Sequence, residues 1–308
     1  MTSRTEKNKE KQEEIIEEEK REARKKIVLL CLKITIALII SFFSFYFYTE
    51  YISTKQIITK EEVIKNEKIP DSFNGIKIIQ FSDLYYGSTI EDKEIDKLIK
   101  EINKRKPDIV LFTGNIIDKK KKLNTTEKEK LIKKLSNINA NIGKYAVTGK
   151  NDDKETFTTM MNQSNFTILD NQYDLIYNND NNPILLIGLS SLIKNERNIE
   201  NAYKYFKEET HNSDIYTISM MSETDDIDEI LSNYKTDLIL AGNSLNGEIR
   251  LPLIGGVIKQ EGSSTYKNPF YQVNDAKIYV SSGIGTATTG VRLFNHPSIN
   301  FLRLTNKD

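Results

Sequence analysis

Cysteine, histidine and tryptophan are scarce in this 308-residue chain, which has one cysteine, two histidines and no tryptophan. A single cysteine excludes both a disulfide framework and a zinc site built from several thiolates. Net charge is absent too, because 44 lysine and arginine side chains balance 44 aspartates and glutamates. With no basic face and no basic patch interleaved with aromatic residues, the sequence predicts no nucleic-acid partner.

The chain does contain an N-terminal appendage and one substantial domain. Residues 1–26 are highly charged, and pairs four apart, such as Glu17 with Arg21, support a solvated helix by about 0.2–0.5 kcal/mol each. No sustained apolar seam accompanies these charges, so we interpret the segment as a solvated or partly disordered cytoplasmic tail. A coiled-coil or partner-binding helix is the alternative.

Residues 27–48 are apolar apart from Lys33 and a few hydroxyl side chains. At about 1.5 Å per residue they can cross a hydrocarbon core of about 30 Å, so they predict a transmembrane helix. Basic residues are denser before this helix than directly after it, which predicts a single-pass protein of the cell membrane with a cytoplasmic N-terminus and an extracytoplasmic main domain. No small-x-small cleavage site follows, which favours an uncleaved signal anchor over a cleaved signal peptide.

We expect residues 49–67 to form a linker and residues 68–308 to form the globular domain. Apolar strands alternate with amphipathic helices in its first half, and strands dominate its second half. This pattern predicts an α/β fold of two packed mixed β-sheets flanked by helices. The expected strands are 77–81, 108–113, 144–148, 173–177, 184–189, 215–221, 237–241, 277–281 and 299–304, and the expected helices are 91–104, 127–135, 153–162, 199–208 and 225–231.

Small polar turns follow several of the predicted strands. Asp83 follows the first, Asn115 the second, residues 149–152 the third, and residues 242–247 a later one. Taken alone, each turn is more typical of a simple strand-to-helix connection. Together they predict a functional crevice, because in α/β folds such turns gather at the carboxyl edge of the sheet.

In this order and spacing, the turns resemble the motifs of the calcineurin-like metallophosphoesterases, in particular their bacterial membrane-anchored branch. The family motifs D-x-H, G-D-x-x-D, G-N-H-[DE], a lone histidine and G-H-x-H correspond here to residues 83–85, 114–118, 149–152, 221–223 and 242–245. Segments that flank the motifs match the family as well, and they read IPDSFNGIKIIQFSDL, PDIVLFTGNIID, EIRLPLIGG and YVSSGIGT. The resemblance therefore spans residues 68–304. It implies a four-layer α-β-β-α sandwich in which two divalent metal ions activate a hydroxide that attacks phosphorus.

The residues at the motif positions differ from those of the family. Of the side chains that would bind metal directly, only Asp83 keeps its identity. The rest of the former metal site reads Asn115, Lys150 and Ser222, other positions expected to carry histidines hold Tyr85, Asn151, Asn243 and Leu245, and Asp118 and Asp152 match supporting positions. The two histidines, His211 and His296, lie away from these turns and are interpreted as surface or loop residues.

These replacements argue against a metal cofactor. Without the bridging carboxylate, two dications would repel each other across the neutral amide of Asn115. We therefore expect no metal, and Asp83 as the ligand if one binds. A further hypothesis places the Lys150 ammonium in the former metal space, in a fixed ion pair with Asp83; the alternative is a lysine directed to solvent.

Three functions are consistent with the sequence. The first is a membrane-anchored, catalytically inactive pseudoenzyme of the phosphoesterase family, which binds an unknown protein or a phosphate-containing ligand outside the cytoplasmic membrane. The second is an active phosphoesterase with a reduced metal site around Asp83, Asp118 or Asp152. The third is an interaction protein that works through its cytoplasmic tail.

Overall fold

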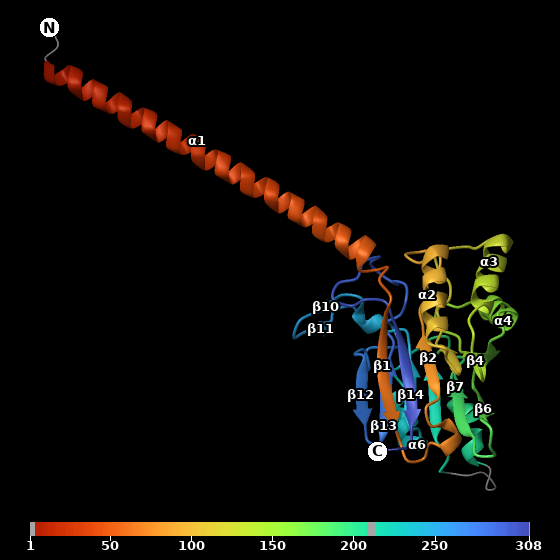
Figure 1. The fold of residues 1–308 in the computed structure, drawn as a ribbon. Helices are drawn as coiled ribbons and strands as arrows, with labels where there is room; N and C mark the ends of the chain where they lie inside the picture. Colours follow the sequence, from red (N-terminus) through yellow and green to blue (C-terminus); the bar gives the residue numbers. More distant parts are fainter. Residues whose placement is uncertain (1–3, 208–213, 308) are drawn as a thin grey trace. The chain divides into compact units, whose positions relative to one another are not determined.

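The computed structural model describes residues 4–207 and 214–307, and its two compact units are Met1–Tyr48 and Thr49–Asp308 (Figure 1). The first unit is one long helix, α1 (Arg4–Phe47). The charged tail belongs to this helix over the residues described, because glutamate and lysine have high helix propensity. The second half of α1 is long and apolar enough to cross a membrane.

The second unit contains two six-stranded sheets (Figure 1). The first sheet has the strand order β1-β14-β2-β3-β4-β5, in which only the β14–β2 pair is antiparallel. The second has the order β12-β13-β9-β8-β7-β6, with antiparallel pairs at its two edges and parallel pairs between. The first sheet is made of β1 (Ile58–Lys65), β2 (Lys77–Phe81), β3 (Ile109–Phe112), β4 (Gly143–Ala146), β5 (Thr167–Ile168) and β14 (Ser298–Thr305). The second is made of β6 (Gln172–Ile176), β7 (Ile184–Gly188), β8 (Thr217–Met221), β9 (Leu238–Ala241), β12 (Phe270–Val273) and β13 (Ala276–Val280).

Alternation of side chains along the buried strands produces the layers. In β2, Ile79 and Phe81 pack against the helices α2 (Asp92–Lys104), α3 (Thr125–Ser136) and α4 (Lys154–Gln163). Ile78 of the same strand and Leu240 of β9 belong to one buried core cluster, so the opposite face meets the second sheet. The outer face of the second sheet is covered by α5 (Ile199–Ala202), the 3-10 helix η3 (Lys204–Lys207) and α6 (Ile227–Asn233). The predicted fold class, two packed mixed sheets flanked by helices, is confirmed.

Several elements differ from the sequence-based expectation. Residues 58–65, placed in the linker, form β1 and pair with β14 at eight positions. The pattern concealed this strand because β1 lies at the sheet edge, and most of its side chains are polar or exposed. The expected helix 199–208 is a short α5 followed by η3, and the expected helix 225–231 begins two residues later, at Ile227. Strands β5 and β12 were not predicted, nor was the small antiparallel pair of β10 (Arg250–Leu251) and β11 (Gly255–Gly256).

Candidate functional site

The predicted turns converge at the carboxyl ends of the parallel strands from both sheets. Asn115, in the turn after β3, donates its side-chain N–H to Asp83 Oδ1 at 2.8 Å. The backbone N–H of Asn243, after β9, donates to Asp83 Oδ2 at 3.0 Å. Asp83, Asn115 and Asn243 all have positive φ (55°, 64° and 58°), a conformation that side-chain-bearing residues rarely adopt and that clusters at functional sites.

Asp83 is completely buried at the centre of this arrangement. Burial raises the pKa of its carboxyl to about 6, because the charged form is poorly solvated. Hydrogen bonds from Ser82, Asn115 and Asn243 oppose this shift, as does the positive charge of Arg292. The carboxylate therefore depends on fixed donors of this chain for its solvation.

Asn115 uses both ends of its amide. Its nitrogen donates to Asp83, and its Oδ1 accepts the backbone N–H of Asn151 at 3.0 Å. The amide thus connects the first and third motif turns directly. A carboxylate at this position could accept from Asn151, but it would repel Asp83 unless a cation lay between them.

Asp152 fixes the neighbouring backbone. Its two oxygens accept the N–H groups of Asn115 and Ile116, each at 2.7 Å, and of Gly149 at 2.8 Å. Burial nevertheless raises the pKa of Asp152 to about 7. Asp118 likewise accepts a backbone N–H, that of Lys120, at 2.7 Å. Both aspartates hold turns in place.

Two larger side chains occupy the space beside Asp83. Tyr85 is almost fully buried, and its hydroxyl accepts a hydrogen bond from Asn151 Nδ2 at 3.2 Å. Leu245 is fully buried next to Gly283. A Cβ on Gly283 would lie 2.3 Å from Leu245 Cδ2 and 2.9 Å from Asp83 Cβ, so this corner has no free volume. Residues that replace histidines of the family pattern therefore fill the crevice around Asp83.

Comparison with known proteins identifies the family. Residues 76–282, more than half of the chain, match the family model described as Calcineurin-like phosphoesterase. This chain belongs to the calcineurin-like phosphoesterase family. It is 28% identical over 240 residues to the uncharacterized metallophosphoesterase YkuE of Bacillus subtilis, covering 77% of this chain and 81% of that protein. It is also 23% identical over 131 residues to the transmembrane protein with metallophosphoesterase domain of Danio rerio, covering 41% of this chain and 29% of that protein. Among solved structures, the calcineurin-like phosphoesterase YfkN from Bacillus subtilis is similar with a TM-score of 0.42 and 12% identity, covering 68% of this chain and 82% of that one.

The residues of this phosphoesterase-family site do not fit the two divalent metals that the family implies. Across residues 4–207 and 214–307, no group of three or more His, Cys, Asp and Glu side chains could hold a metal ion. The three groups that donate to Asp83, from Ser82, Asn115 and Asn243, are neutral. Two oxygens of the motif turns, Ser222 Oγ and Asn243 Oδ1, are buried without a hydrogen-bond partner. His296 is the one histidine within the described residues, and its Nδ1 lies 3.3 Å from the backbone oxygen of Ser53. His211 falls outside the described residues.

The hypothesis of a Lys150–Asp83 ion pair is wrong. The Lys150 Nζ atom donates to Gln260 Oε1 at 3.4 Å, and no carboxylate in the described part of the chain lies within the 4.0 Å ion-pair limit. The backbone explains this outcome, because the Lys150 N–H is held by Glu223 Oε1 at 2.8 Å and the side chain extends from there to Gln260. Burial also lowers the pKa of Lys150.

Two charged residues that the motif analysis did not single out complete the site. Arg292 is fully buried and donates to the backbone oxygens of Ser282 at 2.7 Å and Gly285 at 2.5 Å, on the loop beside Asp83. Burial lowers the pKa of Arg292 to about 10. Glu223 is also fully buried and pairs with Arg197 at 3.3 Å. A sequence signal for Glu223 existed, because it directly follows Ser222 in the fourth motif position.

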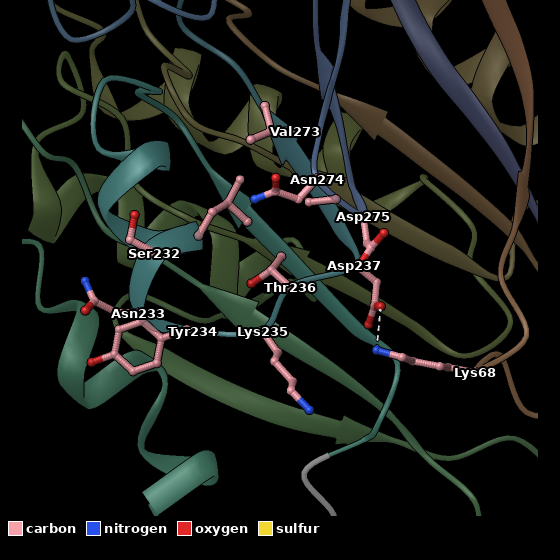
Figure 2. A pocket seen from close by; sticks show the side chains of 12 residues that line it. Lys68, Ser232, Asn233, Tyr234, Lys235, Thr236, Asp237, Val273, Asn274 and Asp275 are labelled. Carbon is pink, nitrogen blue, oxygen red and sulfur yellow. Dashed lines mark hydrogen bonds and ion pairs between the residues drawn. The ribbon is translucent and has the colours of Figure 1, made fainter.

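Two pockets lie at opposite edges of the sheets. One, of about 410 Å³, opens beside Asn151 and Asp152, and four lysines line it: Lys119, Lys121, Lys122 and Lys128. The other, of about 460 Å³, lies between the end of α6 and the turn from β12 to β13, where Lys68 pairs with Asp237 at 3.0 Å (Figure 2). Figure 2 shows that this second pocket is lined by none of the motif residues, so of these two pockets it is the lysine-lined one that is adjacent to the candidate site.

Proposed function

We propose that this protein is a membrane-anchored pseudoenzyme of the calcineurin-like phosphoesterase family, which binds a ligand outside the cytoplasmic membrane without hydrolysing it. The hydrogen bond from Asn115 Nδ2 to Asp83 Oδ1 carries this proposal. In this family a carboxylate at position 115 would bridge the metals, whereas here an amide N–H points at the remaining carboxylate. A donor in that place satisfies the charge of Asp83 without a cation.

The family reaction requires a hydroxide activated by metal, and the described residues around Asp83 offer no substitute for it. Asp83 and Tyr85 are buried, and Tyr85 has its pKa raised well above its ordinary value by burial, so it does not supply an anionic nucleophile near neutral pH. Asp152 is the second acid of the crevice, but both its oxygens are engaged by backbone N–H groups. A reduced metal site on these aspartates is therefore not favoured.

The ligand site proposed is the lysine-lined pocket next to the crevice. Four lysines line this pocket against three aspartates, Asp118, Asp152 and Asp153, which each also accept a backbone N–H, so the charges of the wall favour an anionic ligand by one lysine. Lysines are point charges well suited to phosphate oxygens. A phosphate-containing molecule is accordingly the ligand class that fits this pocket.

The test of inactivity combines metal analysis with an assay on one sample. After dialysis, the purified full-length protein should retain far less than one equivalent of Mn, Fe or Zn. With these metals added, it should hydrolyse bis(p-nitrophenyl) phosphate no faster than its Asp83→Asn variant. Stoichiometric metal, or metal-dependent hydrolysis that Asp83→Asn abolishes, would contradict the proposal.

Ligand binding is measured on the same sample by titration with inorganic phosphate. Lys128→Gln, in the pocket, should weaken binding, whereas Lys133→Gln, an exposed lysine on the same helix α3, should leave it unchanged. Equal effects of the two substitutions would show that phosphate does not bind in this pocket. They would not change the result of the activity test.

A further inference from the structure

A group of exposed apolar side chains lies at the same edge of the sheets as the crevice. It consists of Leu251, Leu253, Ile254 and Val257, on and around β10 and β11, together with Phe294, and we call it the apolar tip. Leu253 is fully exposed, at 109% relative accessibility, and Ile254 is 71% exposed. Large apolar side chains gathered this way on a surface mark an interaction site.

The backbone of the tip is built to display these residues. Leu253 has φ 67° and Phe294 has φ 51°, both in the left-handed region that costs free energy for a residue with a side chain. Arg250 N–H donates to the Leu293 oxygen at 2.9 Å, which joins the β10 segment to the loop that carries Phe294. The strained backbone at Leu253 and Phe294 directs both side chains to the outside, so the strain gains no packing within the domain.

The start of the domain is attached to the same loop. The Arg292 N–H donates to the backbone oxygen of Thr49 at 3.3 Å, and the Ile58 N–H donates to the Pro297 oxygen at 2.9 Å. Thr49, Ser53 and Thr54 are buried in the domain. The first residues after the apolar helix are therefore held next to the segment that includes Phe294.

Chain connectivity then limits where the apolar tip can be. Residues 27–48 have about the length needed to cross a bilayer core, so Thr49 leaves the membrane at its surface. Because Thr49 is bonded to Arg292, two residues before Phe294, the tip is held at that same surface. Residues 250–259 contain Arg250 and Lys259 but no acidic residue, a composition compatible with anionic headgroups.

We propose that the apolar tip inserts into the interfacial region of the membrane in which α1 is anchored. The partner is thus a lipid surface, and the domain has a second point of attachment besides its helix. This inference rests on the proposed membrane anchoring of α1, and the experiment below separates failure of the anchor from failure of the docking.

The absence of tryptophan makes fluorescence a clean test. Full-length single-tryptophan variants are reconstituted into liposomes with or without acyl chains brominated near the headgroups. Leu253→Trp and Phe294→Trp report on the tip, and Phe43→Trp reports on α1. Tyr177→Trp is the matched exposed control, because Tyr177 follows β6 at the opposite edge of the sheets.

We expect brominated lipid to remove most of the emission of Leu253→Trp and Phe294→Trp, with a blue shift, and to leave Tyr177→Trp unchanged. Quenching of Phe43→Trp alone would show an inserted anchor and overturn the docking. A blue-shifted Leu253→Trp that brominated lipid does not quench would show that protein, such as a second copy of the chain, covers the tip, and would also overturn it. Loss of quenching in Phe43→Trp would overturn the anchoring itself.

Discussion

Residue 115 is an asparagine where the family pattern has an aspartate. This exchange of one carboxylate oxygen for an NH2 group has the largest effect on the chemistry of this site. Asn115 donates to Asp83 and accepts from Asn151, so a neutral group connects turns that a charged cluster connects in the family pattern. Sequence motifs predicted which residues would meet, because strand ends fix the backbone positions. They did not predict the partner of Lys150, since four flexible side-chain bonds let it reach Gln260 instead of Asp83.

The pH dependence of stability gives a prediction at this scale. The folded-state pKa of Asp83, about 6, lies above its ordinary value of 3.8, so the folded state binds the proton more tightly than the unfolded state does. The resulting stabilisation is complete below about pH 4 and is lost as the pH rises through 6. At about 1.4 kcal/mol per pKa unit, the loss is on the order of 3 kcal/mol.

Urea unfolding of wild type and Asp83→Asn between about pH 4 and pH 8 measures this loss. The free energy of unfolding of wild type should fall relative to that of Asp83→Asn as the pH rises. The exposed Asp275→Asn serves as the control and should follow wild type at every pH. Parallel curves for wild type and Asp83→Asn would refute the role assigned to the buried carboxyl.

At the scale of elements, the fold was predictable wherever strands are buried on both faces. Strands β3, β7 and β9 consist of continuous apolar runs, because helices cover one face and the other sheet covers the other. Edge strands lack this signal. In β1, which pairs only with β14, one side chain in eight is fully buried, so its composition did not distinguish it from a linker.

Two neighbouring residues of β1 test its place in the sheet. Ile64 is 1% exposed in the core between the sheets, and Val63 is 58% exposed on the same strand. Ile64→Ala should lower the free energy of unfolding by about 2–5 kcal/mol, as for other large-to-small core substitutions. Val63→Ala should change it by less than about 1 kcal/mol. Similar small effects of both substitutions, measured by urea unfolding, would show that residues 58–65 are not part of the folded core.

For the whole molecule, the family sandwich persists although the described residues contain no group of three or more His, Cys, Asp and Glu side chains that could hold a metal ion. The apolar residues that stack the layers lie in the strand and helix interiors, whereas the replaced residues lie in the turns at one edge. Fold and chemistry are therefore encoded in different parts of the chain. This separation explains why the sequence predicted the architecture well but left Arg292 unnoticed, as Arg292 acts from a segment where no ligand was expected.

The single cysteine permits a direct test of the proposed topology. In a Cys31→Ser background, cysteine is introduced at Lys9 or at Tyr177, both exposed. In intact cells, a membrane-impermeant maleimide should label Tyr177→Cys and spare Lys9→Cys, with both labelled after lysis. Labelling of Lys9→Cys alone in intact cells would mean that the domain faces the cytoplasm.

The position of β14 also determines the order in which this domain can be completed. Its residues 298–305 lie between β1 and β2, and they pair with residues 58–65 across 240 positions of sequence. During synthesis, β1 has no partner and β2 keeps one open edge until residues 298–305 emerge. Pairings this distant in sequence form slowly. The edges of β1 and β2 therefore stay exposed in the incomplete domain, and the pairing of β14 with both strands closes the sheet.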